Sequence, residues 1–105
     1  MAATALVEIG GLIEARPGVS GGRPCIRGTG LTVARVAYLS ISQGLRPEGI
    51  IEETGAPVSL ASIHAALAYY YENQAVIDAD VAERQRVHDE LAAAAWPTSL
   101  ANRQR

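Results

Sequence analysis

The chain contains no phenylalanine and only one tryptophan, so large aromatic side chains add little to any core. Four tyrosines are the remaining aromatic residues. Hydrophobic residues make up 49% of the 105 residues, but many of them are alanines, each of which buries little surface. We therefore expect one modest core of Leu, Ile, Val and Tyr, and a protein that gains stability as a homodimer.

Cysteine is nearly absent as well. Cys25 is the single cysteine and cannot form an internal disulfide, which excludes a disulfide scaffold and fits a reducing cytoplasm. No apolar run approaches about 18 residues, and the first residues, Met1 to Thr4, carry no basic side chain. These features predict a cytoplasmic protein with neither a signal peptide nor a membrane span.

Lysine is missing, so all nine cationic side chains are arginines. Residues 16–46 hold five arginines and no acid, whereas residues 48–90 hold nine acids and two arginines, within a net charge of −2. This arrangement indicates two surfaces with different partners. Arginine suits bidentate contacts with phosphate or carboxylate, but a GC-rich genome produces the same bias, and both explanations stay open.

The N-terminal part predicts a small β-hairpin. Short apolar runs within residues 5–14 form one or two strands, and residues 24–27 form a strand that pairs back on them. A glycine-rich loop lies between these segments. It lacks the Gly-Lys-Ser/Thr ending of a phosphate-binding P-loop, so we interpret it as a turn of the hairpin.

Two helices are predicted next. Thr32 is a suitable N-cap for a helix over residues 33–43, and Gly44 stands just beyond its C-terminus. Pro47 opens a second helix over residues 47–54, with Ile50 and Ile51 facing inward. In the first of these helices the expected buried stripe is Val33, Val36, Ala37 and Ser40, with Leu39 at its edge.

Two longer helices follow. Ser59 caps a helix that runs through Asn73, and another helix spans residues 75–95, ending at Trp96-Pro97. In the third helix the apolar spacing predicts a buried side made of Leu60, Ile63, Leu67, Tyr70 and Tyr71. The side chains expected to face outward are Ala61, Ser62, Ala65, Tyr69 and Glu72. The last helix has a weaker stripe of Ile77, Val81, Val87, Leu91 and Ala95.

The predicted fold is therefore mainly α. An N-terminal β-hairpin precedes a three-helix core of the helix-turn-helix type, and a C-terminal helix follows. Residues 1–75 form the hairpin and core domain, and residues 76–105 form the C-terminal helix and a flexible tail.

The helix–glycine–helix segment suggests DNA binding. Ser40, Gly44 and Ile50 stand at the offsets of a helix-turn-helix motif, although Glu53 replaces a usual aliphatic residue. We expect Ser59 and Ser62 to face the major groove. The alternative is an ordinary solvated or dimer-contacting face. The candidates for phosphate contact are Arg23, Arg27, Arg35 and Arg46.

Catalytic patterns are scarce, and we do not expect an enzyme. His64 and His88 lack the spacing of a metal-binding pair, so we predict neither a metal site nor a cofactor. Asp78 and Asp80 point to nearly opposite sides of a helix and cannot share an ion with Glu83 there. We interpret these acids as a solvated face.

One segment resembles a known family. The run Pro17-Gly18 … Gly22-Arg23-Pro24-Cys25-Ile26-Arg27-Gly28-Thr29, followed by Leu31-Thr32-Val33, is similar to the signature of domain-of-unknown-function family four-three-three. The similarity continues through residues 44–51 and 59–70 and covers about residues 7 to 75. One departure is Gly30, where the family pattern has an arginine.

The resemblance implies a helix-turn-helix-class fold and the role of a VapB-like antitoxin. Such an antitoxin neutralises a PIN-like ribonuclease toxin and binds its own operator DNA as a dimer. Because arginine pairs well with carboxylates that hold Mg²⁺, we expect the toxin-binding residues to be Arg84, Arg86, Arg103 and Arg105. The alternative is a protein-interaction module that binds the toxin or another partner without binding DNA.

Overall fold

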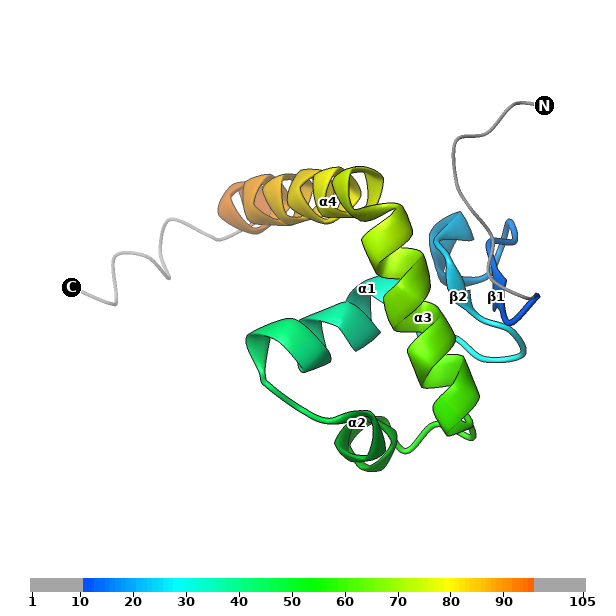
Figure 1. Ribbon diagram of the computed structural model, residues 1–105. Coiled ribbons are helices and arrows are strands. Elements are labelled where there is room, and N and C mark those ends of the chain that lie inside the picture. Colours follow the sequence, from blue (N-terminus) through cyan, green and yellow to red (C-terminus); the bar gives the residue numbers. More distant parts are fainter. Residues whose placement is uncertain (1–10, 96–105) are drawn as a thin grey trace.

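The computed structural model describes residues 11–95 (Figure 1). Its elements in chain order are strand β1 (Ile13–Glu14), a 3-10 turn (Ser20–Gly22), strand β2 (Cys25–Ile26), helix α1 (Val33–Ala37) with its π-helical continuation (Tyr38–Ser42), and helices α2 (Pro47–Thr54), α3 (Leu60–Glu72) and α4 (Gln74–Ala95). The predicted fold class is confirmed, because the described chain is mainly helical with a small antiparallel sheet at its N-terminal end.

The hairpin is short but covers the core with two isoleucines. Ile13 pairs with Ile26 and Glu14 with Cys25, and both isoleucines are buried. The chain then turns back at once, because the Ile26 amide donates to the Leu31 carbonyl and the Val33 amide donates to the Pro24 carbonyl. This places the start of α1 directly beside β2. The strand residues predicted before residue 11 lie outside the described part.

Helix α1 begins as predicted and continues differently. The Thr32 hydroxyl accepts a hydrogen bond from the Arg35 amide at 3.1 Å, which confirms the N-cap. After Ala37 the helix widens, and the Gln43 amide donates to the Tyr38 carbonyl five residues back. The wider turn buries Leu39, which we expected at the edge, and leaves Ser40 only half-buried. Gly44 (φ 70°) ends the helix as predicted.

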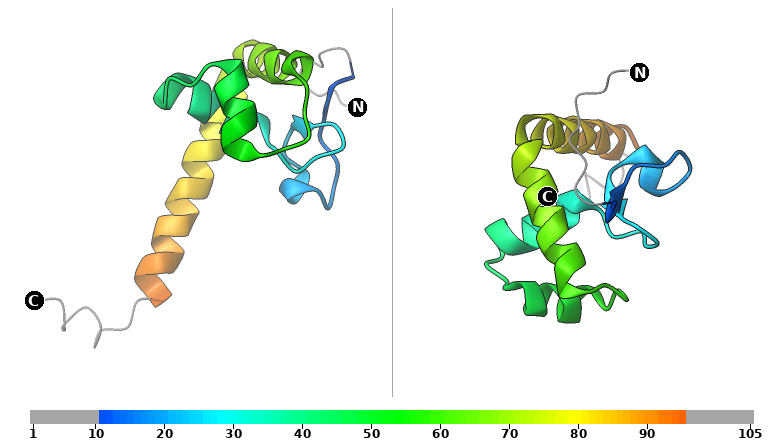
Figure 2. Two further views of the ribbon diagram at one scale, coloured as in Figure 1. Left: turned by 90° about the horizontal axis from the view of Figure 1, so that it is seen from below. Right: turned by 45° about the vertical axis from the view of Figure 1, so that its right-hand side comes forward.

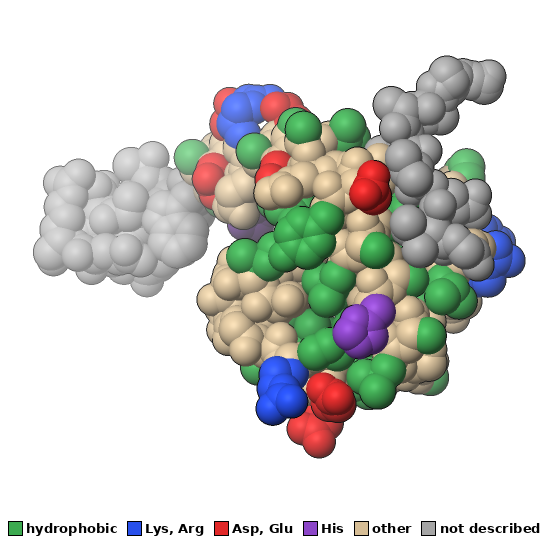
Figure 3. All heavy atoms as spheres, viewed as in Figure 1, with side chains coloured by type: hydrophobic (Ala, Val, Ile, Leu, Met, Phe, Trp, Pro, Cys, Tyr) green, Lys and Arg blue, Asp and Glu red, His purple; other side chains and the backbone are tan. Residues whose placement is uncertain are grey.

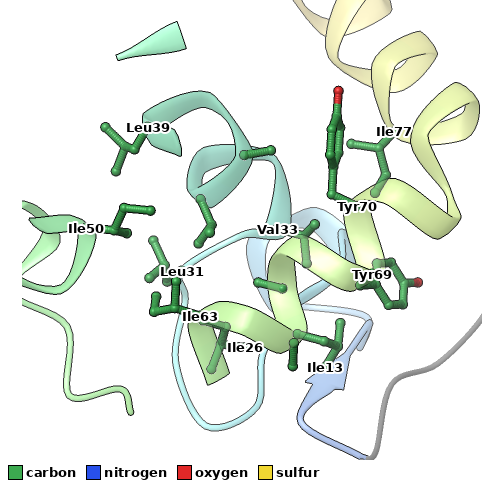
Figure 4. Packing of buried hydrophobic residues seen from close by; sticks show 14 residues of the cluster. Ile13, Ile26, Leu31, Val33, Leu39, Ile50, Ile63, Tyr69, Tyr70 and Ile77 are labelled. Carbon is green, nitrogen blue, oxygen red and sulfur yellow. The ribbon is translucent and has the colours of Figure 1, made fainter. Parts of the chain in front are cut away.

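Helix α3 lies at the centre of the molecule and contacts both strands and helices α1, α2 and α4 (Figure 4). Its buried residues are Ser62, Ile63, Ala65, Ala66, Tyr69 and Tyr70. The outward positions predicted for Ser62, Ala65 and Tyr69 are therefore wrong, as are the buried positions predicted for Leu60 and Tyr71, which are 42% and 57% exposed. Neighbours on several sides leave little room, and the small residues Ser62, Ala65 and Ala66 allow their close approach.

Helix α4 turns sharply away from α3 at Asn73 (Figures 1 and 2). The Asn73 amide donates to the carbonyls of Tyr69 and Tyr70, and its side-chain Nδ2 donates to the Tyr69 carbonyl at 3.0 Å. The Asn73 carbonyl accepts from the Ile77 amide, which begins the new helix. Asn73 thus ends one helix and starts the next while it is itself buried.

Only the first turns of α4 pack on the core. Ile77 is buried, and the Tyr70 hydroxyl donates to Asp78 Oδ1 at 2.7 Å, which joins α3 to α4. Farther along, the predicted stripe does not meet the core, since Val81, Val87 and Leu91 are 41%, 39% and 64% exposed. The rest of α4 projects from the molecule (Figure 2). No helix of the described residues is both long and apolar enough to cross a membrane.

Substitutions of Tyr69 and Tyr71, two residues apart, test which face of α3 is buried. Tyr69→Ala should lower the free energy of unfolding by about 3–5 kcal/mol, because Tyr69 is only 4% exposed and its removal leaves a cavity. Tyr71→Ala should cost about 0.5–1.5 kcal/mol, since it loses mainly its edge contact with Tyr70. Urea denaturation of both variants measures the difference. Equal losses, or a larger loss for Tyr71→Ala, would contradict this packing.

Alkaline pH tests the contact between α3 and α4. The hydrogen bond to the Asp78 carboxylate, with burial, raises the pKa of Tyr70 above its ordinary value of 10.0. The folded state therefore favours the neutral phenol, and this contribution to stability is complete below pH 10.0 and is lost as the pH rises through the raised pKa. Tyr70→Phe should cost roughly 1–2 kcal/mol at neutral pH and should remove that part of the alkaline decline. Tyr71→Phe leaves the Tyr70–Asp78 hydrogen bond intact and should keep the decline in stability at alkaline pH. Denaturation midpoints measured between neutral and alkaline pH compare the two variants. Identical pH profiles for the two variants would refute the assignment of this decline to Tyr70.

Candidate functional site

Of the four arginines expected to contact phosphate, two are exposed and two are bound to loop carbonyls. Arg35, in the first turn of α1, and Arg46, at the N-cap of α2, are exposed. Arg27 donates from Nε to the Gly11 carbonyl at 2.6 Å, and Arg23 donates from Nη1 to the Ser20 carbonyl at 2.8 Å. Two of the four guanidinium groups thus hold the N-terminal loops in place. In Figure 3, basic side chains form small separate groups rather than one continuous basic face.

The two serines expected to face DNA lie at the first turn of α3 and bond to each other there. Ser59 is the N-cap of α3, as its predicted capping role requires, and its hydroxyl accepts from the Ser62 amide at 3.1 Å. Ser62 is 8% exposed, and its hydroxyl lies 3.2 Å from that of Ser59. A hydroxyl buried under the first turn of α3 offers no group to a base edge.

The helix-turn-helix reading also predicted that α3 presents a face to DNA. Helix α3 is the central core helix, and the side that it leaves exposed carries Leu60, His64 and Tyr71 but no arginine, asparagine or glutamine that could read a base. Helix α2 also presents an exposed side. The outer side of α2 carries three exposed carboxylates, Glu48, Glu52 and Glu53, none of which forms an ion pair with a described residue. Carboxylates at this position repel phosphates, so insertion of α2 into a groove of DNA is unfavourable.

The arginines of α4 take part in ion pairs along the helix. Arg84 Nε lies 3.0 Å from Asp80 Oδ2, and Arg86 contacts both Glu83 and Glu90, the latter at 2.6 Å. The two carboxylates raise the pKa of Arg86. Exposed pairs of this kind exchange readily with a partner's carboxylates, because each contributes little to stability. Arg103 and Arg105 lie outside the described residues.

The acidic residues of α4 point in different directions. Asp78 accepts from Tyr70, Asp80 pairs with arginines, and Glu83 pairs with Arg86. Among residues 11–95 no group of three or more His, Cys, Asp or Glu side chains is placed to hold a metal ion.

A groove between the glycine-rich loop and the start of α4 joins residues that are distant in the sequence. Arg23 Nε lies 3.6 Å from Asp80 Oδ2, and Arg84 approaches the same oxygen from the next turn of α4. The groove has a volume of about 270 Å³, and its other walls include Pro24, Val76 and Ile77. The i,i+4 spacing of Asp80 and Arg84 is the one sign of this cluster in the sequence, and no sequence pattern indicates the approach of Arg23.

The projecting part of α4 is, after the groove, the second exposed surface on which a partner could bind. Val87 and Leu91 lie one turn apart on it, and both side chains are substantially exposed. Beside Val81, nearer the core, Tyr38 and Ile41 of the π-helical segment are about half exposed and line a shallow depression with it. Val81, Val87 and Leu91 form an apolar edge along one side of α4, interrupted by Arg84. Glu83, Arg86 and Glu90 lie to one side of this edge.

Comparisons with known proteins give a family and no activity. The profile of the family described as "Protein of unknown function (DUF433)" matches residues 13–70, which span β1 to the end of the core in α3. A crystal structure of a DUF433 member protein from Anabaena variabilis superposes with a TM-score of 0.56 at 33% sequence identity and covers 68% of each chain. No curated protein matches the chain.

The match to the profile includes the hairpin, the glycine-rich loop and the three core helices, and α4 lies beyond it. The solved relative has the same fold, and its sequence identity of 33% indicates common descent. The chain therefore belongs to the DUF433 family.

Proposed function

We propose that this protein is the antitoxin of a toxin–antitoxin pair, which binds and neutralises a PIN-like ribonuclease through α4 and the residues that follow it. The observation that carries the proposal is the projection of α4 from the core with an exposed apolar edge. The same role is the one that the resemblance to family four-three-three implies. In this proposal the protein acts by binding and not by catalysis.

The proposed contact combines two kinds of interaction. Val87 and Leu91 supply apolar surface that is buried only when a partner covers it. Arg84 and Arg86 stand on the same helix, and Arg103 and Arg105 follow it in the sequence. A PIN-like toxin holds Mg²⁺ with clustered carboxylates, and arginines that pair with these carboxylates weaken metal binding. The apolar edge positions the helix, and the arginines inactivate the toxin.

Operator binding is a second proposed activity. It is favoured by Arg35 and Arg46, whose guanidinium groups are exposed and form no ion pair with any residue of the described part. We propose that these two contact phosphates, and that Arg23 and Arg27 contribute less because they already bind loop carbonyls. The protein would do so as a homodimer. A module that binds the toxin without binding DNA is the alternative.

Charge substitutions on α4 test toxin binding. Val87→Asp together with Leu91→Asp should weaken binding to the PIN-like protein encoded by the neighbouring gene at least about tenfold, because both side chains belong to the buried centre of the proposed contact. The matched control is Ala82→Asp together with Ala93→Asp, which adds the same charge on the opposite side of α4. Calorimetric titration and a ribonuclease assay measure the effect. Wild-type inhibition by the first variant, or equal losses in the two, would refute the proposal.

Salt dependence tests operator binding. Gel-shift titrations on the upstream promoter should give a plot of log affinity against log salt whose slope falls by about 0.9 for Arg35→Ala and for Arg46→Ala. Arg86→Ala is the control and should leave the slope unchanged, since Arg86 pairs with Glu83 and Glu90. No retardation of the promoter by the wild-type protein would favour the module that does not bind DNA.

A further inference from the structure

We propose that the groove between the glycine-rich loop and α4 is a binding site for a small oxyanion, a carboxylate or phosphate group carried by a short apolar chain. The groove brings Arg23, Asp80 and Arg84 together, and its volume of about 270 Å³ lies just below the range of about 300–1,000 Å³ for drug-sized ligands, which suits a smaller molecule. The site shares Arg84 with the proposed toxin contact, but Arg23, Asp80 and the glycine-rich loop belong to the groove alone.

The first observation is an unsatisfied donor. Nε of Arg23 is buried and has no hydrogen-bond partner among residues 11–95, although the rest of the side chain is partly exposed. The nearest carboxylate oxygen in an ion pair with it, Asp80 Oδ2, stands 3.6 Å away, which is too far for a hydrogen bond. A buried charged donor without an acceptor is costly, and an oxyanion that displaces the Asp80 carboxylate from beside Nε supplies the acceptor.

The second observation is the balance of charge. Two guanidinium groups face one carboxylate, so the formal charge of the cluster is positive. Within the described residues, Arg84 hydrogen-bonds through Nε alone and Arg23 through Nη1 alone, so donors on both remain available. Arginine pairs recognise carboxylate and phosphate oxygens through such parallel donors. The charge therefore selects an anion, and a cation is disfavoured.

The third observation is the apolar wall. Pro24, Val33, Val76 and Ile77 line the groove beside the charged cluster, and Val76 is half exposed there. Val33 and Ile77 are already buried, so a bare inorganic ion leaves mainly Val76 and the partly exposed Pro24 in contact with water. A short branched alkyl chain attached to the anion covers these two side chains, and we therefore assign that chemistry to the ligand.

Two neighbouring glycines offer a matched test. A Cβ at Gly21 would lie 2.5 Å from Arg23 Nη1, whereas a Cβ at Gly22 would meet nothing within 4 Å. Both residues have positive φ, at 68° and 83°, so alanine strains the backbone at either position. Gly21→Ala should displace the Arg23 guanidinium, and Gly22→Ala should leave it in place.

The experiment follows the Nε–Hε NMR signals of arginine in the full chain during titration with isovalerate, isobutyl phosphate, inorganic phosphate and neutral isovaleramide. The signals of Arg23 and Arg84 should shift and saturate with the alkyl anions only. Gly21→Ala and Arg23→Gln should bind at least about tenfold more weakly than Gly22→Ala, the size of one charge-assisted hydrogen bond. Asp80→Asn should bind more tightly, because it removes the carboxylate that competes for the arginines.

The relative affinities distinguish the two oxyanions. Tighter binding of isovalerate assigns a carboxylate ligand, and tighter binding of isobutyl phosphate assigns a phosphate ester. Absence of saturation with either anion, equal binding of isovaleramide, or equal losses in Gly21→Ala and Gly22→Ala would overturn the proposal. Inorganic phosphate that binds as tightly as the alkyl anions would overturn the assigned apolar chain.

Discussion

The direction of α4 depends on the helix break at Asn73. Asn73 is buried, and its hydrogen bonds to Tyr69 and Tyr70 end α3 while its carbonyl starts α4. Two contacts then hold the new direction, the Tyr70–Asp78 hydrogen bond and the burial of Ile77, and they bring Asp80 beside Arg23. The projecting apolar edge and the oxyanion groove are both consequences of this arrangement, because a straight continuation of α3 would form neither.

Because the core lacks phenylalanine, the attachment of α4 depends in part on polar contacts. Its largest fully buried side chains are isoleucines from four different elements, Ile13, Ile26, Ile50 and Ile63, and each contributes about 1.5–3 kcal/mol by burial. They unite the hairpin, α2 and α3, but only Ile77 extends this packing to α4. The attachment of α4 therefore depends on Ile77 and on the Tyr70–Asp78 hydrogen bond, which leaves most of the apolar surface of α4 available.

The local features of the fold could be predicted from the sequence. Thr32 and Ser59 cap their helices, Gly44 ends the first one, and Pro47 opens the second, because each acts on its own turn of backbone. The buried face of α3 could not be predicted in this way. Hydrophobic spacing favours one apolar stripe, whereas a central helix is buried on several sides and its small residues face its neighbours.

The candidate site was harder to predict than the fold. The sequence grouped Arg23 with other arginines because no acid lies near them in the chain, but folding brings Asp80 to it from α4. Nor does the sequence reveal the π-helical turn after Ala37, which buries Leu39. Such features depend on contacts between distant segments, which neither charge patterning nor helical periodicity describes.

The central claim is that α4 is held in one direction relative to the core. Residual dipolar couplings of backbone amides in the free protein test it most directly. If the claim is right, the couplings of α4 and of α1 to α3 fit one alignment tensor with the orientation of α4 given by the structure. If α4 requires its own, weaker tensor, the helix moves independently, and the fixed groove and positioned apolar edge described above do not exist.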